Sequence, residues 1–486
     1  MSTAVRNLAP KEVWNMFADL NAIPRPSKKE ERVIQFMVDF GKNLNLETFI
    51  DKVGNVIITK PATKGLEDRK TVVLQSHLDM VHQKNSDTVF DFDKEGIKML
   101  IEGDWVTADG TTLGADNGLG VASIMAVLAS TEIEHPNLEA LFTIDEETGM
   151  TGAMGLEGGI LKGEILLNLD TEEDDEIGMG CAGGIDVTAK RTYKEEHVSE
   201  KAMGFTIAIK GLNGGHSGMD IIKGLGNANK IMNRLLFDGF NNFGLRIAEI
   251  NGGSLRNAIP RESDALVTIN AISKEAFLSK TTALINNIKE EFSTIESNLT
   301  IDIQQTTLPE KIMEIGAQEG FLKSMYAAFN GVYRMSPDIT DLVETSNNIA
   351  RVIVKNGEIK IGCLTRSSSE TNKTDLSNSL KSAFELSGFK VTLSGEYPGW
   401  QPNINSEILA IVSKLYTNLH SEKAKVEACH AGLECGILGQ NYPEMDMVSF
   451  GPTIRGAHSP DERASISSTQ KFWKFFIEIL KNIPKK

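Results

Sequence analysis

The stretch Gln75-Ser76-His77-Leu78-Asp79-Met80-Val81 decides how this chain is organised. It follows Thr71-Val72-Val73-Leu74, a β-branched run that predicts a buried strand. Polar side chains at the end of such a strand lie where open α/β sheets bind ligands. On an extended chain His77 and Asp79 point to the same side, so the carboxylate can accept one imidazole N–H and leave the other nitrogen for a metal. The simpler interpretation is a buried structural histidine whose hydrogen bond is made by the neighbouring Asp79. The rest of the chain decides between a metal ligand and a structural histidine.

Length and charge limit the class of protein. The chain has 486 residues, which predicts several domain-sized units, and its hydrophobic fraction of 41% is that of a globular protein. A net charge of −16 disfavours nucleic acid and anionic membranes as partners. Four cysteines are too few for a disulfide scaffold, residues 1–14 lack a secretory signal, and no apolar stretch reaches the roughly 20 residues of a membrane span. We therefore expect a cytoplasmic protein with no nucleic-acid partner and no membrane partner.

The order of the predicted elements indicates two domains. Strands near 55–59, 71–75, 138–144 and 165–169 alternate with helices, which predicts an α/β sandwich with a mixed sheet. The pattern changes after Cys181-Ala182-Gly183-Gly184 and returns from about Ser406. We therefore predict a discontinuous catalytic domain formed by residues 1–186 and 399–486, with an α+β domain inserted at 187–398.

Two helix starts carry the spacing of a capping box. Ser27 and Glu30 precede one amphipathic helix, and Ser467 and Gln470 precede the last helix of the chain. Apolar residues in the last helix recur at intervals of three and four, which predicts one face packed on the core.

Acidic and histidine side chains recur where the predicted strands end. They are His77, Asp79, Asp116, Glu146, Glu147, Asp170 and His458. Two imidazoles and several carboxylates suit zinc, cobalt or manganese, and one bridging carboxylate would let two ions share a water. Asp116, on a turn before a helix, is the natural bridge. Adjacent Glu146 and Glu147 repel unless a cation or a proton separates them, which favours one as a ligand and one as a base. Any single acid of this set could equally be a cap or a solvated loop residue.

Five motifs together resemble the co-catalytic di-zinc exopeptidases of the aminoacylase and carnosinase type. They are Ser76-His77-Leu78-Asp79, Gly114-Ala115-Asp116, Asp145-Glu146-Glu147, Asn168-Leu169-Asp170 and Gly456-Ala457-His458. Three more are similar to those of the bacterial aminoacyl-histidine dipeptidases, a carnosinase-like group also called Xaa-His or cytosol non-specific dipeptidases. They are Arg256-Asn257-Ala258-Ile259-Pro260, Thr365-Arg366-Ser367-Ser368 and His430-Ala431-Gly432-Leu433-Glu434-Cys435-Gly436. The resemblance spans nearly the whole chain.

The resemblance implies two zinc ions per chain, for which Co²⁺ or Mn²⁺ could substitute. It assigns one ion to His77, Asp116 and Asp170, and the other to Asp116, Glu147 and His458. Two further catalytic residues are implied: Asp79 orients His77, and Glu146 is the general base for a hydroxide that bridges the zinc ions. The family also implies a cis peptide bond between Asp116 and Asn117.

By the same resemblance the substrate is a dipeptide, either an Xaa-His such as β-alanyl-histidine or another. Arg366 would bind the free carboxylate with its planar guanidinium, together with Asn257 and the backbone of Gly432, and His216 would stabilise the oxyanion. These groups make the inserted domain a lid, with hinges near Gly183-Gly184 and Pro398-Gly399. The resemblance also implies a homodimer through the lid domain.

Other interpretations stay open at this point. An aminoacylase or tripeptidase of the same family would carry the same metal motifs, as would a metal-binding protein without turnover. Four residues, Cys429, His430, Glu434 and Cys435, could form a separate zinc knot, although they lack a Cys-x-x-Cys pair. The chain has no His-Glu-x-x-His and no Walker-type phosphate loop, which removes the commonest single-zinc protease and nucleotide-binding interpretations.

Overall fold

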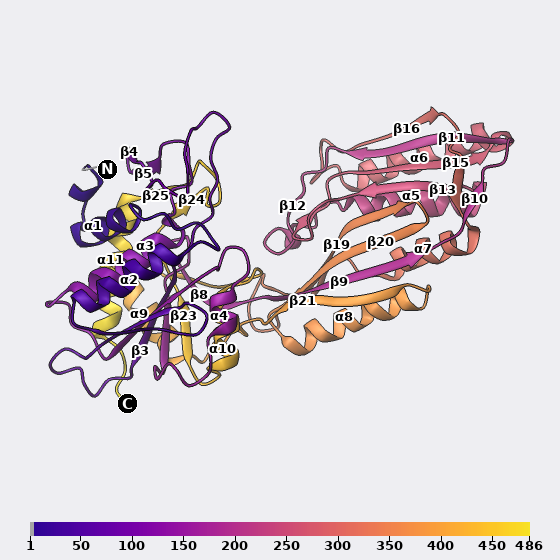
Figure 1. The fold of residues 1–486 in the computed structure, drawn as a ribbon. Helices are drawn as coiled ribbons and strands as arrows, with labels where there is room; N and C mark the ends of the chain where they lie inside the picture. The colour runs from indigo at the N-terminus through magenta and orange to yellow at the C-terminus, as the bar shows by residue number, and fades with distance from the viewer. Residues whose placement is uncertain (1–3) are drawn as a thin grey trace. The chain divides into compact units, whose positions relative to one another are not determined.

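The chain divides into two compact units in a computed structural model that describes residues 4–486. Residues 1–3 lie outside the described residues. They belong both to the expected catalytic segment, 1–186, and to residues 1–14, which lack a secretory signal in the sequence. Unit 1 comprises Met1–Cys181, Trp400–Ala428 and Leu433–Lys486, and unit 2 comprises Ala182–Gly399 and Cys429–Gly432. The segment Cys429–Gly432, which the expected boundaries assign to the catalytic domain, thus clusters with unit 2. Figure 1 shows each unit with its own sheet.

Unit 1 is built on an eight-stranded mixed sheet. Its strand order is β1 (Glu47–Ile50), β2 (Val56–Lys60), β6 (Leu138–Thr143), β3 (Val72–His77), β7 (Ile165–Asn168), β23 (Asp446–Ser449), β8 (Glu176–Cys181) and β22 (Lys425–Cys429). The four central strands, β6, β3, β7 and β23, are parallel, whereas β1, β2 and β8 pair antiparallel. All six residues of β3 are buried, as expected for a central strand with both faces covered.

The helices of unit 1 cover this sheet. Helix α3 (Ala115–Ala129) packs on β3 and on α1 (Lys11–Leu20), and α2 (Glu31–Asn43) packs on β1 and β2. Helix α9 (Glu407–His420) packs on β23 and on α11 (Ile466–Lys481), and α10 (Glu434–Asn441) packs on the short α4 (Thr151–Gly155). A small sheet of β24 (Ile454–Arg455), β25 (Arg463–Ser465), β5 (Trp105–Ala108) and β4 (Met99–Glu102) completes the unit. The α/β sandwich predicted from the sequence is confirmed.

Both predicted capping boxes are wrong in detail. Helix α2 begins after Glu30 with no side-chain cap, because Ser27 donates to Asp79 Oδ2 instead, at 2.8 Å. Helix α11 is capped by Ser465, whose hydroxyl accepts the N–H of Ser468, so the cap lies two residues before Ser467.

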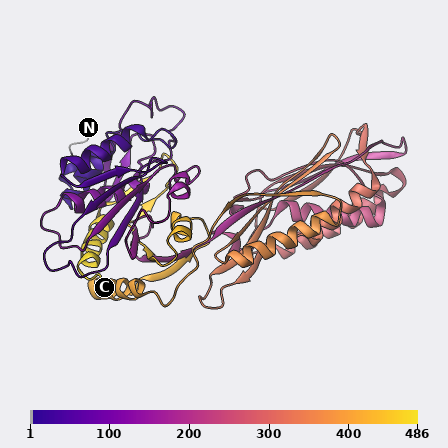
Figure 2. The same cartoon turned by 60° about the horizontal axis from the view of Figure 1, so that its bottom comes forward.

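Unit 2 contains a nine-stranded antiparallel sheet. The order is β16 (Thr300–Thr306), β11 (Ala202–Lys210), β15 (Ser263–Asn270), β13 (Arg246–Gly252), β19 (Val343–Lys355), β20 (Glu358–Ser367), β9 (Gly183–Thr192) and β21 (Lys390–Tyr397), with β18 (Gly331–Met335) also paired to β19. Its helices α5 (Ala228–Phe243), α6 (Lys274–Glu291), α7 (Ile315–Ala327) and α8 (Glu370–Glu385) line one face of the sheet (Figure 2). Alternate strand residues pack beneath them in one apolar core.

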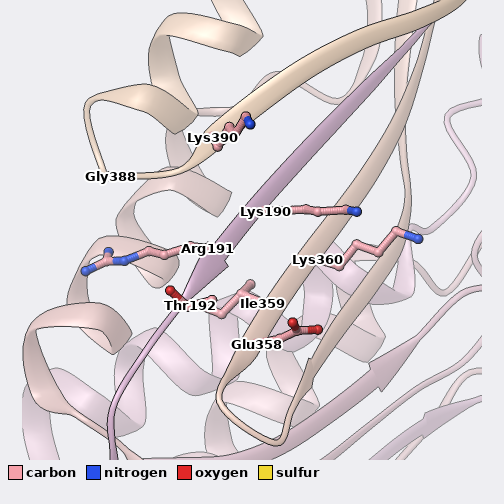
Figure 3. Close-up of a pocket in the computed structure, with 8 residues that line it drawn as sticks. All are labelled: Lys190, Arg191, Thr192, Glu358, Ile359, Lys360, Gly388 and Lys390. Carbon is pink, nitrogen blue, oxygen red and sulfur yellow. The ribbon is translucent and has the colours of Figure 1, made fainter.

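The opposite face of this sheet carries a row of three lysines. Lys190 of β9 is paired directly with Lys360 of β20 on one side and with Lys390 of β21 on the other. Their side chains are exposed beside a cavity of about 580 Å³ (Figure 3). Like charges at directly paired positions repel, so this row lowers the stability of the sheet edge.

Short elements complete unit 2. Strand β10 (Glu195–His197) pairs with β17 (Lys311–Met313), and β12 (Gly215–His216) pairs with β14 (Ala258–Ile259). Among residues 4–486, no helix is both long and apolar enough to cross a membrane.

Candidate active site

The parallel strands of unit 1 bring the predicted site residues to one edge of the sheet. Because β3, β6, β7 and β23 are parallel, their carboxyl ends meet there. His77 is the last residue of β3, Glu146 and Glu147 follow β6, and Asp170 follows β7. His458 lies in the loop between β24 and β25, further along the segment that follows β23. Asp116 joins them from the first turn of α3. Strand topology therefore explains why residues spread over almost 400 positions converge.

Asp116 lies between the two imidazoles. Its Oδ1 is 3.2 Å from His77 Nε2, and its Oδ2 is 3.2 Å from His458 Nε2. The same nitrogen of His77 is 3.6 Å from Asp170 Oδ1, and that of His458 is 3.0 Å from Glu147 Oε2. Two groups of potential ligands result, each with its ligand atoms within 4.8 Å of one another: His77, Asp116 and Asp170, and Asp116, Glu147 and His458.

The donor set fits a pair of divalent cations. Imidazole and carboxylate donors without thiolates suit zinc, cobalt and manganese. In the described part of the chain, the buried Oε1 of Glu147 has no hydrogen-bond partner, which is costly for a carboxylate unless a cation neutralises it. Each oxygen of Asp116 faces a different imidazole, which is the arrangement that a bridging ligand requires.

Protons balance the excess negative charge of this cluster when no metal is present. The hydrogen bonds that His458 donates to Asp116 and Glu147 raise its pKa to about 11. Burial lowers the pKa of His77, but Asp170, Asp116 and Asp79 outweigh burial and raise it well above the usual value. Burial raises the pKa of Asp170 to about 6. Burial would also raise the pKa of Asp116, but hydrogen bonds from the two histidines hold it well below its usual range.

Asp79 contacts both the imidazole of His77 and the loop that carries Glu146. His77 Nδ1 is 3.1 Å from the Asp79 backbone oxygen and 3.4 Å from its carboxylate Oδ1, so the other ring nitrogen, Nε2, faces Asp116 and Asp170. The backbone N–H of Glu146 donates to Asp79 Oδ1 at 3.0 Å, and that of Glu147 donates to Oδ2 at 3.3 Å. Burial raises the pKa of Glu146 well above its usual value, which suits a group that accepts and returns a proton. The Asp116–Asn117 peptide bond is cis, as the resemblance implies, and the Asn117 side chain donates to Asp170.

A second cluster forms within unit 2 around Arg366. This side chain of β20 is 5% exposed, and its Nη1 donates to the Tyr397 hydroxyl at 2.7 Å. Its Nη2 is 3.4 Å from His216 Nε2. Asn257 adjoins the same turn, since its backbone oxygen accepts the N–H of Ser217 at 2.8 Å. Gly432 lies in the returning segment of unit 2, and no described hydrogen bond joins it to Arg366.

Two neutral histidines accompany this guanidinium. Burial and the charge of Arg366 lower the pKa of His216 and lower that of His430 to about 3. His430 Nε2 is 2.8 Å from the Ser346 hydroxyl. Arg366 is therefore the charged member of the cluster at neutral pH.

The proposed zinc knot is not formed. The groups of described residues that could hold a metal do not include Cys429, His430, Glu434 or Cys435. Glu434 instead accepts hydrogen bonds from Gln75 and Thr143, each at 2.6 Å, inside unit 1.

Three residues near these clusters were not predicted from the sequence: Tyr397, Arg25 and Glu462. The Tyr397 hydroxyl touches Arg366, whereas Arg25 and Glu462 bind the backbone of the segments that carry His77 and Asp116. The available signals were weak: Glu462 follows His458 in the same loop, and Arg25 stands between two prolines.

The chain is similar in sequence and fold to several known proteins. The family model "Peptidase family M20/M25/M40" matches residues 73–482. The cytosol non-specific dipeptidase of Escherichia coli (strain K12) is 44% identical over 479 residues, which cover 99% of each chain. The crystal structure of an aminoacylhistidine dipeptidase from Vibrio alginolyticus superposes with a TM-score of 0.94 and 43% identity, covering 100% of this chain and 99% of that one. A tripeptidase from Staphylococcus aureus, at 17% identity and a TM-score of 0.57 with 98% and 99% coverage, shares the fold.

Proposed function

The chain belongs to peptidase family M20/M25/M40, and on that basis we propose that Asp116 bridges two metal ions in unit 1. The chain is a peptide hydrolase of the dipeptidase type, because the relatives that match it over its full length are dipeptidases. The position of Asp116 between two imidazoles carries the proposal for the metal pair. We assign His77 and Asp170 to one ion and Glu147 and His458 to the other, with zinc as the expected metal and cobalt or manganese as substitutes.

Glu146 is the proposed general base. When bound, the metal pair acidifies a water and polarises the scissile carbonyl. The Glu146 carboxylate takes the proton of that water and then delivers it to the leaving amine. The high pKa that burial gives Glu146 favours this shuttle, and the hydrogen bonds of its loop to Asp79 fix its position.

Arg366 is the proposed binding group for the substrate carboxylate. Its guanidinium is buried beside two neutral histidines, so its charge is available to an anionic partner. Tyr397 orients it through the bond to Nη1. We propose that Asn257 and the Gly432 backbone assist this recognition and that His216 stabilises the oxyanion. Because one relative is an aminoacylhistidine dipeptidase, Xaa-His dipeptides such as β-alanyl-histidine are the first substrates to test.

The proposed compartment follows the name of one relative, and the proposed oligomeric state follows the resemblance described in the sequence analysis. We propose a cytosolic location, because the name of the Escherichia coli relative gives that compartment for that protein. We also propose a homodimer through unit 2, the lid of the resemblance. Sedimentation equilibrium tests this state: a dimer has twice the chain mass of 53.1 kDa, and a persistent mass of 53.1 kDa would contradict it.

Replacement of the base tests the catalytic proposal directly. Glu146→Gln keeps the shape of the side chain but removes the proton acceptor, so kcat for a dipeptide should fall by about 10²- to 10⁴-fold. Metal content should stay at two ions per chain, because Glu146 is not among the assigned ligands. A Gln variant with near-normal kcat would remove Glu146 from the base role, and one that loses metal would make it a ligand.

A further inference from the structure

One buried carboxylate accepts four consecutive backbone N–H groups next to the proposed bridging ligand. Glu462 Oε2 accepts the N–H of Leu113 at 2.7 Å and of Gly114 at 2.9 Å. Its Oε1 accepts the N–H of Ala115 at 2.7 Å and of Asp116 at 3.2 Å. Glu462 is 2% exposed, so these charge-assisted bonds are shielded from water. The carboxylate thus fixes the backbone that presents Asp116.

Glu462 also belongs to the turn that presents His458. The N–H of Glu462 donates to the carbonyl of Ser459 at 3.1 Å, and the N–H of Ser459 donates to that of Gly456 at 3.2 Å. His458 lies inside this turn with a positive φ of 66°. One side chain therefore couples the segment that holds Asp116 to the turn that holds His458.

Arg25 completes the connection on the other side of Gly114. Its Nη2 donates to the Gly114 carbonyl at 2.6 Å, while Nη1 donates to the carbonyls of Leu78 at 3.0 Å and Asp79 at 3.1 Å. Arg25 is 1% exposed and has the opposite charge to Glu462. The peptide units of Gly114 thus lie between a buried cation and a buried anion. His77 Nδ1 is 3.1 Å from the same Asp79 carbonyl, which joins His77 to this network.

We propose that Glu462 and Arg25 are positioning residues that set the spacing of the ligand segments of His77, Asp116 and His458. This inference rests on the metal ligands proposed above. Neither residue touches substrate in this role; each acts through backbone groups. Outer groups that orient metal ligands typically change metal affinity or activity by about 10- to 100-fold when they are removed.

Glu462→Gln is the principal test, with Co²⁺ as the probe. The amide retains one accepting oxygen but turns an NH₂ group toward backbone donors, so part of the segment loses its partner. We expect Co²⁺ affinity, measured by chelator competition, to fall by about 10- to 100-fold, and the visible absorption of bound Co²⁺ to change. The kcat should fall in the same range while KM for a dipeptide stays within about threefold, because substrate contacts are intact.

Glu139→Gln is the matched control. Glu139 of β6 is 8% exposed and accepts the backbone N–H groups of Lys162 and Gly163, each at 2.8 Å, at the opposite edge of the same sheet. The Glu139→Gln substitution removes a comparable buried carboxylate and leaves the segments that carry the proposed ligands unchanged. We expect a similar loss of thermal stability and unchanged Co²⁺ affinity. An equal loss of Co²⁺ affinity in both variants would overturn the positioning role.

Conservative variants decide the matter if Glu462→Gln does not fold. Glu462→Asp keeps the negative charge on a shorter side chain, and Arg25→Lys keeps the positive charge but has one ammonium group in place of the forked guanidinium. Each variant should show the selective loss of Co²⁺ affinity and kcat. Parent-like values in these folded variants would refute the proposal. A parent chain that binds no Co²⁺ would instead refute the ligand assignment itself, which separates that failure from failure of the positioning role.

Discussion

At the scale of single residues, the chemistry of Arg366 makes a sharp prediction. Arg366→Ala should raise KM for dipeptides by about 100-fold, since a bidentate, charge-assisted contact of roughly 3 kcal/mol would be lost. The matched control is the same dipeptide with an amidated carboxyl terminus, which lacks the charge that Arg366 would bind. Steady-state kinetics on both substrates provide the measurement. Equal responses of the two substrates would exclude the carboxylate role.

The raised pKa of His458 predicts that metal and protons compete. Because that pKa is about 11 without metal, the imidazole is protonated at neutral pH and must release its proton to coordinate. Apparent metal affinity should therefore rise with pH between 6 and 8, by about tenfold per unit for each displaced proton. Titration calorimetry in two buffers of different ionisation enthalpy counts the protons. Proton release of zero would contradict the assignment of His458 as a ligand.

The convergence of the proposed ligands was predictable from the sequence, whereas the residues that hold their backbone in place were not. Acids and histidines stand at strand ends in His77, Glu147 and Asp170, and parallel strands bring such ends together. Glu462 bonds to backbone groups almost 350 positions away, and backbone amides carry no signature in a sequence. For that reason a loop glutamate after His458 is indistinguishable from a solvated turn residue before the fold is known.

At the scale of elements, two side chains with the spacing of a helix cap instead form hydrogen bonds to residues near the candidate site. Ser27 donates to Asp79, and Glu30 accepts the backbone N–H of Asp145 at 3.1 Å. The spacing of a capping box was therefore present without its hydrogen bonds. Strands were predicted more accurately, because alternation and burial decide them: the run expected at 138–144 is β6, Leu138–Thr143.

The lysine row of unit 2 predicts an unusual stabilising substitution. Lys190→Glu would replace two repulsive cross-strand pairs, with Lys360 and Lys390, by attractive ones. We expect the free energy of unfolding to rise by about 1 kcal/mol at low salt, and the gain to shrink as salt screens the charges. Urea unfolding at two ionic strengths measures it.

The control for this substitution is Lys210→Glu in β11 of the same sheet. Lys210 is paired with Thr300, so the same change of charge removes no opposed lysine. Its effect should stay within about 0.5 kcal/mol. A gain as large as that of Lys190→Glu would show that net charge, rather than the lysine row, governs stability.

At the scale of the whole molecule, metal binding should stabilise the two units unequally. All proposed ligands belong to unit 1, and a ligand at 100 times its Kd stabilises its folded state by about 2.7 kcal/mol. Hydrogen exchange of the full chain, with and without Zn²⁺, should show slower exchange in β3, β6 and β7. Exchange in β9 and β20 of unit 2 should change little. Equal protection of both sheets would contradict a metal centre confined to unit 1.

The inserted domain was predictable from the sequence, but the return of residues 429–432 to unit 2 was not. A change of strand pattern near Cys181 and Ser406 indicated an inserted domain, while the excursion of Cys429–Gly432 is too short to carry a periodicity. Its membership of unit 2 depends on tertiary contacts, such as that between His430 and Ser346.

That four-residue excursion has a consequence for biosynthesis. A ribosome that has delivered residues 182–399 has made almost all of unit 2, yet the imidazole that will meet Ser346 is still to be translated. Until codon 430 has been read and the nascent chain has cleared the exit tunnel, the Ser346 hydroxyl lacks the imidazole that it contacts in the folded chain. Maturation of the second unit is thereby tied to near-completion of the first.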